Sequence, residues 1–389
     1  MKTFSSLQNI LRKISRPRIF LLTMITVATA AGFGFVGSKE TSGDEYVAHE
    51  WGTFTSVQAS DGVLLNWQAV APVELPGFVY NWARPGLNRV AVPDFSKSFL
   101  MALQRMETPV IYFYGDEAQK VDVTVRFPKG KITEWYPQAK DIGPSLPRLA
   151  TNQSSKNFLA GYGVAPSTNG TKESLIRWNL DILPSRQTSP VTLPVEKSGN
   201  HYFAARETDA AILRVNPTES DPLPNEYEKF LFYRGVGNFG TPLKVTMSAS
   251  GEITLANTSK ETLKHLFILG VDDGAGKFVH VAKIPAGEQK TLRLDVQKQK
   301  VPLQKLVPQV SSALAKALTD QGLYQRESDA MVKTWKDSWF QEEGLRVLYV
   351  LPRAWTDQTL PIDFTPAPRD LVRVMVGRAE LITPDFENK

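Results

Sequence analysis

Residues 46–137 form short segments in which apolar and polar positions alternate, a pattern typical of half-buried β-strands. In KVDVTVRF, the apolar residues from Val121 to Phe127 occupy every second position. METPVIYFYG and KITEWYP are also rich in β-branched and aromatic residues, and the turn-forming sequences GDEAQ and PKG separate these segments. Similar segments resume at HYFAARETDAAILRV and YEKFLFYRG. The pattern predicts an antiparallel β domain over residues 46–235.

Residues 138–200 interrupt this pattern, because they contain many prolines, serines, threonines and asparagines and show little periodicity. A loop of this length is uncommon inside a compact domain unless it has a function or is mobile. We expect an irregular insertion that contributes one strand near Leu175 to Leu183. Its role stays open.

Residues 240–298 contain short strand-like segments separated by the turn sequences SASGE, NTSKET, DDGAG and PAGE. A spacing of about 8–12 residues between such turns is typical of a small antiparallel sandwich. We expect an immunoglobulin-like β-sandwich here. Asp272 and Asp273 precede Gly274, and this sequence fits a hairpin turn rather than a calcium loop, because the spacing of an EF-hand is missing.

Residues 302–342 show apolar residues three or four positions apart, and this spacing predicts two helices. The first apolar stripe runs from Leu303 to Leu318, and its helix should end at Gly322. The second helix, from about Gln325 to Gln341, places Met331, Trp335 and Trp339 on one face. These indoles are expected to pack on a sheet, and stacking on sugar rings is the alternative.

The terminal residues 345–383 read as strands that pack on the preceding domains. The chain is therefore predicted to be mainly β, with an antiparallel β domain, an immunoglobulin-like β-sandwich and an αα-hairpin near the C-terminus.

The first 38 residues contain a basic segment followed by an uncharged apolar stretch over residues 19–37. This order is that of an export signal, so we expect an extracytoplasmic protein, either periplasmic or secreted. The sequence Ala28-Thr29-Ala30 fits cleavage before Ala31. The apolar stretch of 19 residues is also marginally long enough to span a bilayer. Cleavage of a signal peptide and anchoring to the inner membrane by residues 19–37 both stay open.

The charge balance argues against nucleic acid as a partner. The chain has 45 Lys and Arg against 40 Asp and Glu. The whole excess lies in the leader, at Lys2, Arg12, Lys13, Arg16 and Arg18. The remainder is neutral, whereas nucleic-acid-binding domains carry a clear positive surplus.

The composition also narrows the chemistry. The chain has no cysteine, which excludes disulfides, thiolate catalysis and cysteine-ligated metals. It has 4 histidines and lacks HExxH, GxSxG, Walker and dinucleotide-binding patterns. We expect no metal site and no cofactor.

Several charged residues occupy strand positions where apolar residues are expected. Glu107 falls with Ile111 and Phe113 in strict alternation, while Glu134 and Arg234 fall on the apolar faces of their own strands. A buried charge must be paired, protonated or directed into a cleft.

Two interpretations of these charges stay open. Either Glu107 or Glu134 pairs with Arg234 as a structural link, or both carboxylates line a polar pocket with His49 as base or ligand. The candidate catalytic residues are therefore Glu107, Glu134 and His49. The candidate binding residues, taken with the nearby Trp67 and Trp82, are Trp51, Trp135, Tyr233 and Arg234.

The motifs HEWGTFT, RMETPVIYFYG, ITEWYP, EKFLFYRGVGNF and LVRVMVGRAEL occur in this order along the chain. Together they resemble a family of uncharacterised exported bacterial proteins, over residues 47–383. The resemblance implies a unit that runs across the predicted sandwich and helical hairpin, and it assigns no catalytic role to any residue.

These observations favour an exported cell-envelope protein that binds a ligand or partner, such as a glycan or an envelope protein, without catalysis. One alternative is an extracytoplasmic hydrolase that uses Glu107, Glu134 and His49. The other is a purely structural envelope protein. The sequence leaves open whether the protein is an enzyme.

Overall fold

The computed structural model describes residues 46–69, 75–81, 101–143, 174–184, 191–196, 200–215, 224–294 and 298–388. The predicted leader, Trp82 and most of the predicted insertion at 138–200 lie outside these ranges. Residues Asp44–Lys389 form one compact unit. None of the helices within the described ranges has the length and apolar character needed to cross a bilayer.

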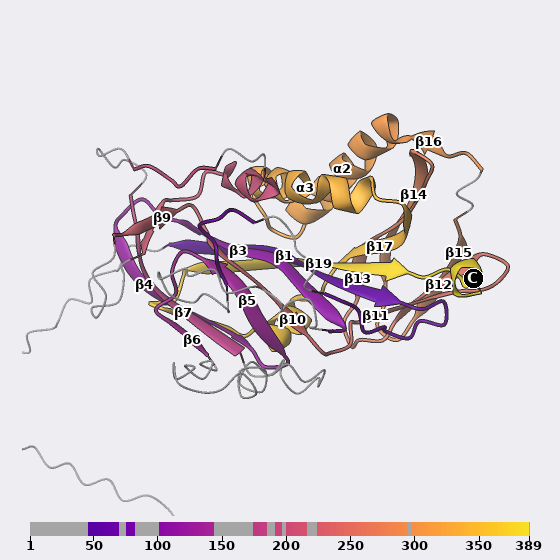
Figure 1. Ribbon diagram of the computed structural model, residues 1–389, viewed down its shortest axis with the longest axis horizontal. Coiled ribbons are helices and arrows are strands. Elements are labelled where there is room, and N and C mark those ends of the chain that lie inside the picture. Colours follow the sequence, from indigo (N-terminus) through magenta and orange to yellow (C-terminus); the bar gives the residue numbers. More distant parts are fainter. Residues whose placement is uncertain are drawn as a thin grey trace, which may run out of the picture. The chain divides into compact units, whose positions relative to one another are not determined.

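A ten-stranded sheet forms the centre of the unit (Figure 1). Its strands are Val47–Gln58 (β1), Tyr80–Asn81 (β2), Gln104–Tyr114 (β3), Gly130–Tyr136 (β5), Leu231–Gly237 (β10), Leu263–Asp272 (β13), Ala275–Ile284 (β14), Val301–Pro302 (β16), Gly344–Val350 (β17) and Asp370–Leu381 (β19). Their order is β16-β14-β13-β17-β19-β1-β3-β10-β5-β2. Neighbouring strands are antiparallel except β1 and β19, which pair in parallel in the middle of the sheet.

Two smaller sheets complete the β-structure. One contains Gln119–Phe127 (β4), Asp141–Gly143 (β6), Ser174–Ile182 (β7), Leu213–Val215 (β8), Glu226–Glu228 (β9) and Ile362–Thr365 (β18). The other contains Leu243–Met247 (β11), Glu252–Asn257 (β12) and Gln289–Arg293 (β15). The alternating residues Val121, Val123 and Val125 of β4 are all buried, and β7 is the strand predicted within the insertion.

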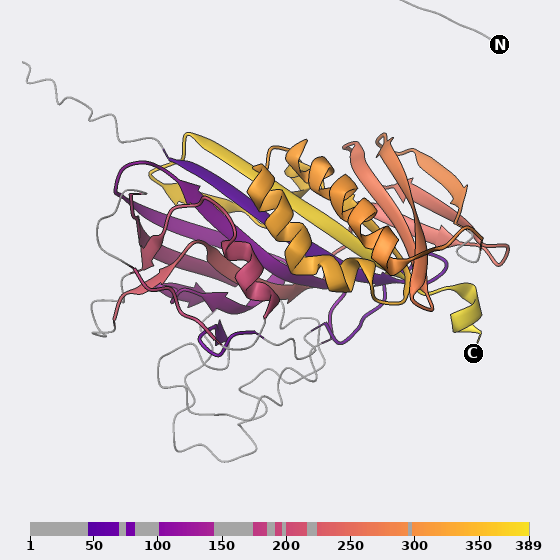
Figure 2. The same cartoon turned by 90° about the horizontal axis from the view of Figure 1, so that it is seen from above.

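The helices are Leu303–Thr319 (α2), Gln325–Phe340 (α3), Arg353–Thr359 (α4) and Pro384–Glu387 (α5), and His201–Arg206 is a 3₁₀ helix (η3). The predicted αα-hairpin is confirmed, since α2 and α3 lie side by side across the ten-stranded sheet (Figure 2). Gly322 lies between them with a φ of +107°, a conformation that favours glycine. Trp335 is 6% exposed and Trp339 is 0% exposed, so the prediction that these indoles are packed is confirmed.

The opposite face of the ten-stranded sheet packs against α4 and the six-stranded sheet. Phe54 of β1 contacts Trp355 of α4 edge to face, with ring centroids 5.3 Å apart. Phe113 of β3 lies 6.2 Å from Phe364 of β18. The sheet is thus buried on both faces, which explains why β1 is apolar or uncharged at most positions and why its charged residues are paired.

Residues 240–298 do not form a closed sandwich of their own. Strands β11, β12 and β15 form the three-stranded sheet, whereas β13 and β14 belong to the ten-stranded sheet through the pairing of β13 with β17. Asp273 and Gly274 form the turn between β13 and β14, with φ angles of 49° and 66°, as the hairpin interpretation predicts. The prediction of a mainly β protein with large antiparallel sheets is confirmed.

Candidate functional site

A β-bulge decides on which face of the sheet Glu107 lies. The pairing of β1 with β3 shifts register between Trp51 and Thr53, and Thr108 has a φ of 49°. Past the bulge, Phe113 points toward the six-stranded sheet, whereas Glu107 lies on the side of α3 and accepts a hydrogen bond from Thr55 Oγ1 at 2.8 Å. The prediction that Glu107 and Phe113 share a face is therefore wrong, because the extra residue changes the parity of the strand.

Charged side chains from adjacent strands, together with the hydroxyl of Thr55, form a row on the α3 side of the sheet, which we call the charged row. Its members, in strand order from β17 to β5, are Arg346, Glu380, Arg378, Thr55, Arg105, Glu107, Arg234 and Glu134. The cross-strand register aligns Arg346 with Glu380, Arg378 with Thr55, Thr55 with Arg105, and Arg234 with Glu134.

At one end of the charged row, two arginines share Glu380. Arg346 Nε lies 2.9 Å from Glu380 Oε1, and Arg378 Nε lies 2.5 Å from the same oxygen. Arg378 Nη2 also donates to Glu342 Oε2, just beyond the end of α3, at 2.7 Å. The predicted structural pair of Arg378 and Glu380 is thus present as part of a larger network.

At the other end, Arg234 donates to Glu134 through Nε at 2.7 Å and through Nη2 at 3.0 Å. This bidentate geometry is the strongest form of an arginine–carboxylate pair. Between the two ends, Arg105 Nε lies 2.9 Å from Glu107 Oε1. Every charged member of the row thus has an ion-pair partner, and the ion pairs form three groups along it.

A pocket of about 390 Å³ lies over the middle of the charged row, and we call it the α3 pocket. Arg105, Glu107, Arg378 and Glu380 contribute to its lining from the sheet. Residues from α3 and from η3 also line it, and the rings of Trp335 and His201 lie 5.5 Å apart. The half-buried Trp67, which bridges to Ala102, completes the wall.

The environments of the arginines differ. Burial is the largest effect on the pKa of Arg234 and lowers it, but Glu134 and Glu107 together raise it by more, so the net shift is upward. The same balance raises the pKa of Arg378 through Glu380 and Glu342. For Arg105, burial and the neighbouring Arg234 and Arg378 lower the pKa more than Glu107 and Glu134 raise it. The charge of Arg105 is thus the least compensated of these three.

His201 is held in its neutral form at neutral pH. Burial lowers the pKa of His201 below 6.5, and Arg234 and Arg105 lower it further, while Glu107 opposes the shift. A neutral imidazole offers one hydrogen-bond donor and one acceptor. The α3 pocket therefore combines paired charges, a neutral imidazole and indole rings.

The structure does not bring the three predicted catalytic residues together. Glu107 lines the α3 pocket, whereas Glu134 is buried and paired with Arg234. His49 is buried at the start of α3, where its Nδ1 lies 2.7 Å from Glu327 Oε2. No metal-binding group of three histidines or carboxylates occurs within the described ranges.

Most of the predicted binding aromatics are core residues. Trp51, Trp135 and Tyr233 are buried, and Tyr233 donates a hydrogen bond to Glu50 Oε1 at 2.5 Å. Arg234 is engaged by Glu134. A row of exposed rings at these positions is therefore ruled out, and Trp67 is the predicted aromatic that lines the α3 pocket.

The sequence reasoning missed Arg105, His201 and Glu342 as pocket residues. Arg105 lies two positions before Glu107 in RMET, which is the spacing of neighbours on one strand face and was a usable signal. His201 and Glu342 reach the pocket through tertiary packing, and no local pattern marks them.

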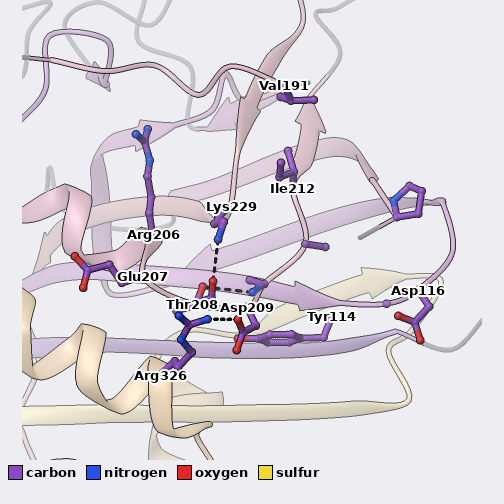
Figure 3. A pocket seen from close by; sticks show the side chains of 14 residues that line it. Tyr114, Asp116, Val191, Arg206, Glu207, Thr208, Asp209, Ile212, Lys229 and Arg326 are labelled. Carbon is purple, nitrogen blue, oxygen red and sulfur yellow. Dashed lines mark hydrogen bonds and ion pairs between the residues drawn. The ribbon is translucent and has the colours of Figure 1, made fainter. Parts of the chain in front are cut away.

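A second pocket, of about 900 Å³, lies beside Tyr114 (Figure 3). Its cations are already engaged: Lys229 Nζ donates to Thr208 O at 2.8 Å, and Arg326 pairs with Asp209. Arg206 Nη2 lies 2.6 Å from Glu228 Oε2. The α3 pocket is the better candidate site, because Glu107 and Trp67, two of the residues predicted from the sequence, line it and none of them lines the second pocket.

Comparisons with known proteins give no family. No family model matches the chain, and no curated protein matches it. Among solved structures, it is similar to the yeast delta-COP-I mu-homology domain, at 8% identity, and to the same domain complexed with a Dsl1 WxWxV peptide, at 7% identity. Each alignment covers 87% of this chain and 96% of that chain, with a TM-score of 0.28. Similarity at this level carries no argument about function.

Proposed function

We propose that the protein is an exported ligand-binding protein of the cell envelope and that the α3 pocket binds a glycan without catalysis. The observation that supports this proposal is the lining of the pocket, in which Trp67 stands beside paired carboxylates and arginines. Sugar rings have apolar C–H faces that pack on indoles and hydroxyl groups that bond to charged planar side chains. The pocket volume of about 390 Å³ is within the range of small-ligand sites.

The ion pairs of the charged row also favour binding because they fix the side chains in advance. Arg378 is held between Glu380 and Glu342, and Glu107 is held between Arg105 and Thr55. A site whose groups are already ordered loses little conformational entropy when a ligand enters.

The extracytoplasmic location rests on the leader, whose basic segment precedes the apolar residues 19–37. An envelope location would place the pocket where glycans are abundant. Within this proposal, residues 240–298 are an immunoglobulin-like module that shares its main sheet with the binding unit.

The hydrolase alternative has less support, because Glu107, Glu134 and His49 have separate partners and only Glu107 lines the α3 pocket. Binding of a glycan without turnover favours the proposal over the hydrolase. The absence of any ligand would favour the purely structural alternative.

Isothermal titration calorimetry with a panel of neutral and acidic oligosaccharides tests the proposal on the leaderless chain from residue 39. We expect a sugar that binds the wild type and binds Trp67→Ala at least tenfold more weakly. Phe386→Ala is the matched control, because Phe386 is an exposed aromatic residue outside the pocket. Failure of the folded wild type to bind any sugar, or equal binding by Trp67→Ala, would overturn the proposal.

A further inference from the structure

Arg105 has fewer partners than the other arginines of the charged row. Arg346 bonds to Glu380 and to the backbone carbonyls of Trp339, Glu342 and Glu343. Arg234 and Arg378 each make two hydrogen bonds to carboxylates. Among the described residues, Arg105 has Glu107 as its one partner, through Nε at 2.9 Å.

The terminal amino groups of Arg105 are therefore free of acceptors from the described part of the chain, while the side chain is 13% exposed. Arg105 lines the α3 pocket, so we look for an acceptor of these groups in a ligand of the pocket. A guanidinium with its two terminal amino groups unengaged presents the planar donor pair that matches a carboxylate.

The electrostatic balance agrees with this geometry. Burial lowers the pKa of Arg105, and the nearby Arg234 and Arg378 add to the shift, with only partial opposition from Glu107 and Glu134. A negative group bound to Arg105 would offset the part of its positive charge that Glu107 and Glu134 do not offset.

Two further polar atoms in the walls of the pocket are also donors. Trp67 Nε1 and Trp335 Nε1 are buried without a hydrogen-bond partner among the residues that the structure describes. The acceptors, by contrast, are already used: Glu107 by Arg105 and Thr55, and Glu380 by two arginines. The other two lining carboxylates, Glu342 and Asp337, are engaged by Arg378 and by Gln341, so the unengaged charged donors of the described lining belong to Arg105.

We propose that Arg105 anchors a carboxylate and that the ligand of the α3 pocket is an acidic sugar of the uronic acid class. This inference rests on the proposed function and adds the charge of the ligand to it. A carboxylate fits better than a phosphate, because four carboxylates also line the pocket and repel a dianion more strongly than a monoanion; they are those of Glu107, Asp337, Glu342 and Glu380.

Calorimetry on the wild type with glucuronate, its methyl ester, glucose and glucose 6-phosphate tests the inference. The ester keeps the ring and removes the charge. We expect glucuronate to bind at least tenfold more tightly than the ester and glucose, and more tightly than the phosphate. Equal binding of acid and ester, or tighter binding of the phosphate, would overturn the carboxylate anchor.

Two variants locate the anchor. Arg105→Met should remove the preference for glucuronate over its ester, and Arg105→Lys should retain part of it, because the charge remains but the planar donor pair is lost. Arg326→Met is the control, since Arg326 is exposed and lies outside the α3 pocket. An unchanged preference in folded Arg105→Met would contradict the role of Arg105.

The two proposals fail in different ways. If glucose and the ester bind as well as glucuronate, the pocket is a sugar site without a carboxylate anchor, and only this inference falls. If the folded wild type binds none of the four probes and no member of the oligosaccharide panel, both proposals fall.

Discussion

His49 Nδ1 lies 2.7 Å from Glu327 Oε2, so a residue of the first strand bonds to the first turn of α3 although 278 residues separate them. Glu327 also accepts hydrogen bonds from the Tyr114 hydroxyl at 2.8 Å and from the Tyr324 backbone amide at 2.7 Å. One buried carboxylate thereby caps α3 and joins the helix to two strands of the sheet. His49 has a structural partner here rather than a place in the α3 pocket.

Removal of this carboxylate should loosen the start of α3. We expect Glu327→Ala to lower the free energy of unfolding by about 3–5 kcal/mol, because it removes the partner of one buried and two partly buried polar groups. Urea unfolding gives the free energy, and hydrogen exchange shows whether the first turn of α3 opens. Asp329→Ala, on the exposed side of the same helix, is the control. A loss below about 1 kcal/mol for Glu327→Ala would show that solvent replaces the carboxylate.

The pair of Arg234 and Glu134 offers a test of a buried charge. Arg234→Met should destabilise the protein by about 3–5 kcal/mol, because Glu134 is then buried without a counter-ion. The double variant Arg234→Met/Glu134→Gln should recover much of that loss, and urea unfolding of all four species closes the cycle. Equal stability of the single and double variants would mean that solvent reaches Glu134. Glu107 is expected to contribute less than Glu134, since its ion pair is with Arg105 and its charge acts on Arg234 only from a distance.

The packing of the tryptophan stripe predicts a large cavity effect. Trp335→Ala should lower the free energy of unfolding by about 3–5 kcal/mol, whereas Trp335→Phe should retain most of the packing. Trp335 stacks near Trp339, with ring centroids 6.2 Å apart, so tryptophan fluorescence reports the change in addition to urea unfolding. If Trp335→Ala is as stable as the wild type, the indole is not part of the core.

The depressed pKa of His201 makes stability depend on pH with a definite sign. Burial lowers the pKa of folded His201 below its ordinary value of 6.5, so the unfolded chain takes up the proton first as the pH falls. Stability is therefore lost as the pH falls below about 6.5. His201→Gln should show a smaller loss of unfolding free energy between pH 7 and pH 5 than the wild type. His265 and His280 shift in the same direction, and the comparison with the wild type cancels them. An identical pH profile would contradict the burial of His201.

The proposed export depends on the basic residues before the apolar stretch. Replacement of Arg16 and Arg18 by Glu should block export, because charge asymmetry at the start of the signal orients it in the membrane. Replacement of both by Lys keeps the charge and should leave export intact. Cell fractionation with detection of the full chain measures the outcome. Normal export of the Glu variant would contradict the signal assigned to residues 1–38.

The local patterns of the chain predicted its elements well. The spacing of three and four residues gave both helices of the hairpin, and the turn at Gly322 followed from a glycine after the last apolar position. The alternation in β4 gave a buried strand. These features depend on residues close in sequence, where side-chain direction follows directly from position.

The partners of the buried charges could not be predicted in the same way. The bulge near Thr108 moves Glu107 to the other face of β3, and strict alternation does not show a bulge. Arg105 is different, because it lies two positions before Glu107 on the same strand face and this spacing could have identified it. The contact of His49 with Glu327 depends on how a distant helix docks, and no local pattern encodes it.

The parallel pairing of β1 and β19 joins the two ends of the described chain in the middle of the main sheet. Thr53 donates a hydrogen bond to the carbonyl of Val376, 323 residues later. Strand β19 also separates β1 from β17 in the middle of the main sheet. In a nascent chain that ends before Asp370, β1 and β17 each have an unpaired edge in the middle of the main sheet. Such edges attract other chains.

We therefore expect the main sheet to close only after the last strand has left the ribosome. Contacts between the two ends of the chain are slow to form, because the long loop between them has to close first. We expect a chain whose main sheet closes this late to be still open at the time when the proposed export would pass it through a narrow translocation channel.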